Sequence, residues 1–180
     1  MLEITIPEVE YFNESTNEFF QVKAQTVKLE HSLVSVSKWE SKWKKPFLDK
    51  TPKTREESVD YVRCMNMTQN VNPLAFNGLT KENMDEIGKY IEDSHTATWF
   101  NDHKQPHGQR EIVTSELIYY WMVAFNIPME CQKWHLGRLI TLIKICNLKS
   151  QKPKKMSRKQ IMSNNHALNA ARRAKFNSKG

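Results

Sequence analysis

Three histidines form the one cluster in this sequence whose residue types and spacing could hold a metal ion. His95, His103 and His107 lie in a polar stretch, and the last two are four residues apart, which on a helix would put both ligands on one face. Pro106 and Gly108, however, predict a loop, and neither an HExxH pattern nor a cysteine partner accompanies the histidines. We therefore interpret them as loop histidines that face solvent, and expect no metal site.

The sequence supports neither nucleophilic nor acid–base catalysis. There is no GxSxG motif, and Cys64, Cys131 and Cys146 lie in helical patterns, where a thiol behaves as a small apolar group. Glu116 and Glu130 could in principle pair as acid and base, but any helical protein offers such pairs. Neither GxxxxGK[ST] nor GxGxxG occurs, so no nucleotide cofactor is implied. We expect a protein that is not an enzyme and needs no cofactor.

His135 and Arg138 are three residues apart and could form an anion site on one face of a helix. The interpretation that we favour is structural. In it, His135 is half-buried and hydrogen-bonded to a neighbouring helix, while the stem of Arg138 covers apolar surface.

The positive charge of this chain is concentrated at its C-terminal end. Residues 149–180 hold ten of the 27 lysine and arginine residues and none of the 20 aspartate and glutamate residues, so the first 148 residues carry 17 against 20. A run of one sign attracts anionic partners such as nucleic acid or an acidic protein surface. The predicted partner-binding residues are Lys152, Lys154, Lys155, Arg158, Lys159, Arg172, Arg173 and Lys175.

Residues 2–12 and 18–30 alternate between apolar and polar side chains, and the polar stretch 13–17 separates them. Period-two alternation places one face of each segment on a core, so we predict a β-hairpin. Because two strands alone are only marginally stable, other elements must cover its edges.

From residue 32 the apolar spacing becomes helical and predicts a short helix that ends before Pro46, with Ser37 and Glu40 as a capping box. We expect Trp39 and Trp43 to belong to the core. The alternative is that both tryptophans stack on nucleic-acid bases beside three neighbouring lysines.

Further helices are predicted at 55–69, 81–92, 115–125, 129–147 and 158–175. The first two begin after Thr54 and Thr80, and the third after Thr114 or Ser115. Helix 115–125 is hydrophobic nearly all round and is expected to be central, paired with 129–147 and packed on the N-terminal hairpin. The last helix has few apolar residues, so we expect it to become ordered on a partner.

Composition agrees with a mostly helical fold in a reducing compartment. Five glycines in 180 residues argue against glycine-dependent nucleotide loops and tightly turned all-β folds. Three widely spaced cysteines suggest no disulfide framework. The N-terminus shows no secretion signal, and residues 117–127, the most apolar stretch, fall short of the ~20 residues that cross a bilayer. We therefore expect a soluble, intracellular protein without membrane contact.

Several segments resemble small proteins from the structural gene module of tailed bacteriophages, most closely the tail assembly chaperone-like family. The resemblance rests on Leu29–Trp43, Thr96–Trp99, Ser115–Met122, Ile127–Pro128, Trp134–Ile140 and Leu168–Phe176. It implies a non-enzymatic protein of the host cytoplasm that escorts the tape measure protein while the tail assembles, and it leaves open whether the protein stays associated with the virion. It assigns no residue a role in binding.

Together these observations predict an α+β, mostly α protein. Residues 1–148 form a globular domain, with the hairpin at 2–30 and helices up to 147, and residues 149–180 form a basic linker and tail helix. The expected function is protein–protein interaction in bacteriophage tail assembly, with an acidic or helical partner and with an oligomer left open. The alternative is a nucleic-acid-binding protein whose basic arm contacts phosphates.

Overall fold

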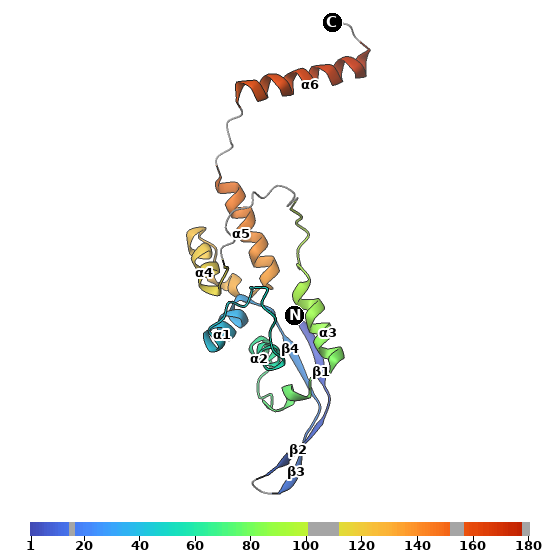
Figure 1. Cartoon of the computed structure of the whole chain (residues 1–180), viewed down its shortest axis with the longest axis vertical. Coiled ribbons are helices and arrows are strands. Elements are labelled where there is room, and N and C mark those ends of the chain that lie inside the picture. The colour runs from blue at the N-terminus through green and yellow to red at the C-terminus, as the bar shows by residue number, and fades with distance from the viewer. Residues whose placement is uncertain (15–16, 101–111, 152–156, 178–180) are drawn as a thin grey trace. The chain divides into compact units, whose positions relative to one another are not determined.

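The computed structural model describes residues 1–14, 17–100, 112–151 and 157–177. Contacts divide the chain into two units, Met1–Asn147 and Leu148–Gly180. The predicted class, mostly helical α+β with an N-terminal hairpin, is confirmed (Figure 1). In the part of the chain that the structure describes, no helix is both long and apolar enough to cross a membrane.

The N-terminal hairpin is long and is interrupted once on each side. Its base pairs β1 (Leu2–Ile6) with β4 (Gln25–Leu29), and its outer half pairs β2 (Val9–Asn13) with β3 (Glu18–Val22), all antiparallel. Ile4, Ile6, Val27 and Leu29 point into the core, as the alternation predicted. Here the hairpin prediction is confirmed, with its turn in the expected stretch.

Other segments cover both edges of the base of the hairpin. The segment after α2 (Arg55–Met65) lies along β4, where the Met67 N–H donates to the Lys28 carbonyl at 2.8 Å. On the other side, α3 (Lys81–Glu92) packs on β1, and the Asn83 side-chain amide donates to the Thr5 carbonyl at 3.3 Å. The β1–β4 pair is therefore stabilised by elements far away in sequence.

The first helix, α1 (Leu33–Trp43), begins earlier than the predicted capping box implies. Its N-cap is Ser32, and the box is formed with Ser35. The prediction that Ser37 and Glu40 form the box is wrong, because both residues lie inside the helix. Glu40 is instead buried, and its carboxylate accepts hydrogen bonds from two other segments of the chain.

The next two helices start where the sequence predicted. Thr54 and Thr80 each form a capping box, with Glu57 and Asn83 respectively, and α3 has the expected bounds. Helix α2 stops at Met65, several residues before the predicted end at 69, because the chain there turns to pair with β4. A 3-10 helix, η1 (Ala75–Gly78), connects α2 to α3.

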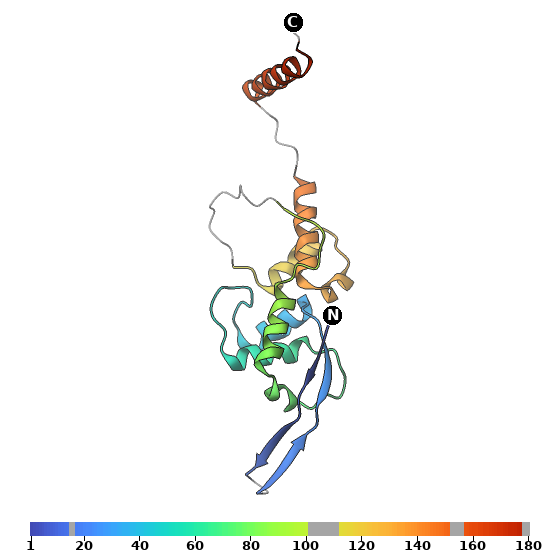
Figure 2. The same ribbon diagram turned by 90° about the vertical axis from the view of Figure 1, so that its right-hand side faces the viewer.

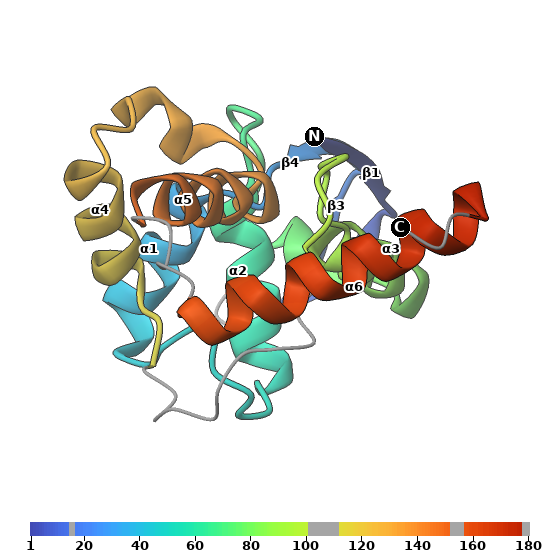
Figure 3. The same ribbon diagram turned by 90° about the horizontal axis from the view of Figure 1, so that it is seen from above.

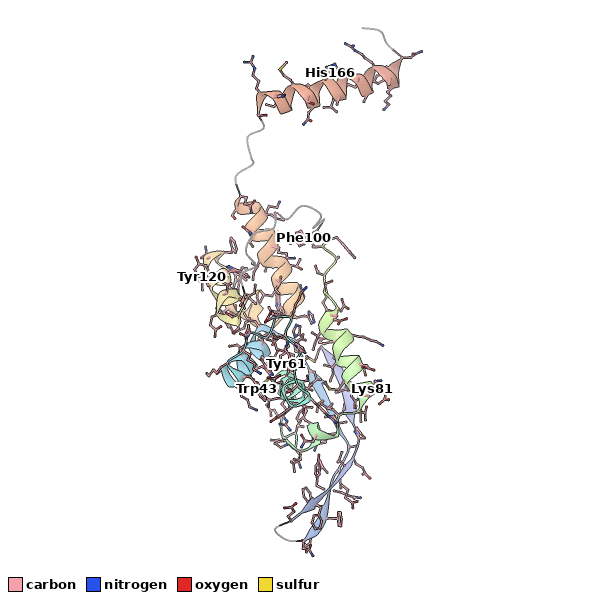
Figure 4. The ribbon with its side chains drawn as sticks, in the orientation of Figure 1. Trp43, Tyr61, Lys81, Phe100, Tyr120 and His166 are labelled. Carbon is pink, nitrogen blue, oxygen red and sulfur yellow. The ribbon has the colours of Figure 1, made fainter. Side chains whose placement is uncertain are left out.

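Helix α4 (Ser115–Ala124) begins after the expected cap, Thr114, but it is not central. Ile118 and Met122 are buried on the side that packs on α1, while Tyr120 and Val123 are about two-thirds exposed. Figure 4 shows Tyr120 on the outer side of α4. Periodicity could not assign this helix a buried face, since nearly all its side chains are apolar.

The predicted helix 129–147 is two helices in the structure. Residues Met129–Lys133 form a 3-10 helix, η2, and α5 runs from Leu136 to Ser150. The break occurs where His135 forms an isolated bridge with Ser32. Helix α4 lies beside α5 (Figures 1 and 3) and α1 packs on α4, but it is α3 that packs on β1. The prediction that the α4–α5 pair packs on the hairpin therefore needs this correction.

Candidate functional site

The candidate site is α6 (Arg158–Phe176), the one helix described in the second unit. Five of the eight predicted partner-binding residues lie on it, and all five are exposed: Arg158, Lys159, Arg172, Arg173 and Lys175. The other three, Lys152, Lys154 and Lys155, lie outside the described residues. The structure thus places the described candidates on one helix, where the sequence predicted them.

The cations of α6 lie in two groups, one at each end of the helix. With a rise of 1.5 Å per residue, Lys159 and Arg172 are about 20 Å apart along the axis. Between them the helix exposes Ile161, Met162 and Leu168. Because Ile161 and Leu168 are seven residues apart, they share a face, and Arg172 extends that face by one turn.

No acidic residue occurs in α6, and in the described residues no ion pair involves its cations. The cations near the C-terminal end oppose the helix dipole favourably, whereas Arg158 and Lys159 face its positive end. The charges of Arg158 and Lys159 therefore do not stabilise α6. This arrangement suits an anionic partner that supplies the missing counter-charge.

An apolar cleft opens in the first unit between α4 and α5. It has a volume of about 660 Å³, and its walls include Trp121 and Phe125 of α4 and Ile140 and Ile143 of α5. The tryptophan, isoleucine and phenylalanine side chains give this cleft an apolar wall. Asp49, Lys50 and Lys144 also line it.

Three histidine rings, which the sequence did not bring together, form a cluster near the C-terminal end of α3 and the start of α5. The His135 ring lies 5.1 Å from that of His31 and 4.1 Å from that of His95, centroid to centroid. Figure 4 shows Tyr61 in the middle of the first unit, and its hydroxyl oxygen lies 2.5 Å from His31 Nδ1. Residues from four separate segments meet here.

The hydrogen bonds of His135 suit a neutral imidazole. His135 Nε2 donates to the Tyr90 carbonyl at 3.1 Å, and the Gly137 N–H donates to His135 Nδ1 at 3.2 Å, so protonation of Nδ1 would break a hydrogen bond. Burial, with the charge of His95 second, lowers the pKa of His135. Burial, followed by the charges of His135 and His95, lowers the pKa of His31 to about 3. Because His31 and His135 take up protons more readily in the unfolded chain, they make the stability of the first unit depend on pH.

The predictions for individual histidines met different outcomes. His135 is buried and bonded to α3 through the Tyr90 carbonyl, which confirms the structural interpretation, and the Arg138 guanidinium lies 4.4 Å from the centre of the Trp134 ring. His95 does not face solvent freely, because its ring packs on Tyr90 and His135. His103 and His107 lie outside the described residues. In the described ranges, no group of three or more His, Cys, Asp or Glu side chains could hold a metal ion.

Two of the catalytic candidates, Cys64 and Glu116, have shifted pKa values. Burial raises the pKa of the Cys64 thiol, which disfavours the nucleophilic thiolate. Hydrogen bonds from its own backbone N–H and from Thr114 lower the pKa of Glu116, whereas a general acid needs a raised pKa.

The tryptophans of α1 are core residues. Trp39 is buried and donates from its indole N–H to the Glu57 carbonyl at 2.9 Å. Trp43 is half-buried and donates to Asp60 at 2.9 Å. The alternative in which both rings stack on bases is wrong for Trp39, because its ring is covered.

Sequence reasoning missed the histidine cluster, the apolar cleft and the exposed aromatics at the end of the hairpin. Each depends on which distant segments become neighbours, and no local spacing signals that. The chain matches no protein-family model, no curated protein and no solved structure.

Proposed function

We propose that this chain is a non-enzymatic interaction protein of bacteriophage tail assembly that binds an acidic or helical protein partner through α6. One observation carries the proposal. Helix α6 forms a unit apart from the core, exposes five cations and contains no acidic residue. The suspected partner is the tape measure protein of the same virus, met in the host cytoplasm, on the strength of the resemblance described above.

The layout of α6 favours a helical partner. Between its two cation groups the helix exposes Ile161, Met162 and Leu168 among polar residues, so a matching surface carries acidic groups at both ends of an apolar stripe. A long amphipathic helix carries such an apolar stripe along one face, with charged residues beside it. Binding would also stabilise α6, because a helix without tertiary contacts is only marginally stable in water.

The first prediction concerns the five cations. Replacing Arg158, Lys159, Arg172, Arg173 and Lys175 by glutamine should weaken capture of the co-expressed tape measure protein by at least about tenfold, because the charge-assisted contacts are lost. Co-purification and titration of the purified proteins measure this. The thermal transition of the chain should stay unchanged, since the core does not include these side chains.

A matched control removes the same charge from the first unit. It replaces the exposed residues Lys38, Lys50, Lys81, Lys89 and Lys133 by glutamine. Unchanged capture by this control, with loss in the α6 variant, supports the proposal. Equal loss in both variants would show that only net charge matters, and retained capture by the α6 variant would refute the role of α6.

The second candidate function is nucleic-acid binding. It is favoured by the same uninterrupted positive charge, but α6 offers a single aromatic ring, Phe176, for stacking. A gel shift with random duplex DNA at rising salt tests it, because counterion release makes such affinity fall steeply with salt. A shift at low salt that the α6 variant loses would favour this candidate over the first.

A further inference from the structure

The outer half of the hairpin, β2 and β3 with the residues between Val9 and Val22 that the structure describes, is called here the hairpin arm. Figures 1 and 2 show it extending from one end of the first unit. Since paired residues of antiparallel strands point to the same side, the arm has two distinct faces. One carries Tyr11 and Phe20, and the other carries Phe12 and Phe19.

The face with Tyr11 and Phe20 is attached to the first unit. The Tyr11 hydroxyl donates to the Leu74 carbonyl at 2.7 Å, and its ring stacks on Phe20 at 5.6 Å. Val22 is buried, and a side chain at Gly78 would overlap that of Val9. These contacts hold the arm against the rest of the first unit, close to where the arm joins the base of the hairpin.

The opposite face is uncovered in the part of the chain that the structure describes. Phe12 and Phe19 form a cross-strand pair with ring centroids 4.9 Å apart, yet they are 47% and 69% exposed. Glu10 and Gln21 form the adjacent pair on this face. Two neighbouring exposed aromatics on a fixed element are typical of a binding surface.

The charge of the arm is opposite to that of α6. Residues 7–24 contain Glu8, Glu10, Glu14 and Glu18 and a single basic residue, Lys23. All four glutamates are exposed. Of these, Glu10 lies on the Phe12–Phe19 face itself, so a partner that brings both apolar side chains and positive charge fits this surface.

We propose that the Phe12–Phe19 face of the hairpin arm binds α6 of a second copy of this chain. The spacings agree: Phe12 and Glu10 are two strand residues apart, about 7 Å, and Leu168 and Arg172 are four helix residues apart, about 6 Å. With Leu168 on the aromatic pair, Arg172 reaches Glu10. Ile161 or Lys175, seven residues to either side on the same face, extends the contact.

A second copy is favoured over the chain's own α6 by the position of the arm. In Figures 1 and 2 the arm and the C-terminal part of α5 within the first unit lie at opposite ends of that unit. Different surfaces meet in this contact, so it is heterologous and can be repeated from copy to copy. Because it uses the same helix as the proposed function, a second copy and a partner protein compete for α6.

The test uses two charge-reversed variants of the full chain. The arm-reversed variant carries Glu8→Lys and Glu10→Lys, and the helix-reversed variant carries Arg172→Glu and Lys175→Glu. Sedimentation velocity at low salt should show concentration-dependent association of the unaltered chain. Each variant alone should associate at least about tenfold more weakly, because like charges then meet. An equimolar mixture of the two should regain association, since each supplies the surface that the other lacks.

The matched control carries Asp85→Lys and Glu86→Lys, two exposed acidic residues of α3, and should associate like the unaltered chain. A chain that stays monomeric over the whole concentration range, or a mixture that fails to associate, overturns the inference. So does a control that weakens association as much as the arm-reversed variant. Because only the purified chain is used, these outcomes leave capture of a tail protein by α6 untouched.

Discussion

Replacing Glu40 by alanine is expected to lower the free energy of unfolding by about 2 to 6 kcal/mol. Glu40 is buried in α1, and its two carboxylate oxygens accept from the Phe47 N–H at 2.7 Å and the Ser115 N–H at 2.8 Å. Each buried donor that loses its partner costs about 1–3 kcal/mol. One of these donors opens α4, where a negative charge also opposes the helix dipole favourably. Denaturant unfolding followed by circular dichroism measures the loss.

Two further variants make this result specific. Glu40→Gln keeps one acceptor oxygen but turns an amide N–H₂ group toward the second donor, so it should lose an intermediate amount of stability. Glu86→Ala removes an exposed carboxylate from the middle of α3 and should change stability by well under 1 kcal/mol. If Glu40→Ala proves as mild as Glu86→Ala, the carboxylate does not tie α1 to α4 as described.

Acidification is expected to destabilise the first unit well above the pH at which carboxylates protonate. The unfolded chain binds a proton at His31 below its ordinary pKa of 6.5, whereas the folded chain resists until about pH 3. Stability is therefore complete above pH 6.5 and falls as pH drops, by about 1.4 kcal/mol per pH unit for this residue. His135, whose pKa is also lowered, adds to the effect. Unfolding titrations at several pH values measure the slope.

The histidine responsible can be identified by substitution. His31→Gln keeps a polar side chain beside the Tyr61 hydroxyl but cannot take up a proton, so the dependence on pH between 6.5 and 3 should become shallower. His166→Gln, on the exposed surface of α6, should leave it as it was. Figure 4 labels the His166 side chain on α6. Equal slopes for His31→Gln and the unaltered chain would contradict the assignment.

The elements that could be predicted from the sequence are those with strong local signals. The hairpin followed from alternation of apolar residues, and the starts of α2, α3 and α4 followed from Thr54, Thr80 and Thr114. These signals act within a few residues of the chain. At these positions no tertiary contact among the described residues competes with the local signal, so the local signal decides the structure.

What could not be predicted depends on contacts between distant segments. The Ser37–Glu40 pair has the form of a capping box, but the buried donors of Phe47 and Ser115 use the Glu40 carboxylate. Helix 129–147 is broken because His135 pairs with Ser32, more than a hundred residues earlier. In both cases a local pattern competes with a tertiary hydrogen bond, and the tertiary bond decides.

In the candidate site, too, some features could be predicted from the sequence and others could not. Concentration of charge at the C-terminal end was visible in the sequence, and α6 carries it with the expected bounds at its start. The hairpin arm was visible only as a strand pattern, because alternation does not tell which face is covered. Only the contacts of Tyr11 with Leu74 show that Phe12 and Phe19 are left on the open side.

The most direct test of the central claim, that α6 is a separate unit that binds partners, is hydrogen–deuterium exchange of its backbone amides. The free chain is measured at high dilution and again with the tape measure protein. We expect residues 158–176 to exchange almost as fast as an unfolded peptide when free and at least about tenfold more slowly in the complex, while α2 stays protected in both. Amides of α6 that are as protected as those of α2 in the dilute free chain, or that stay fast in a complex that has formed, would contradict the account.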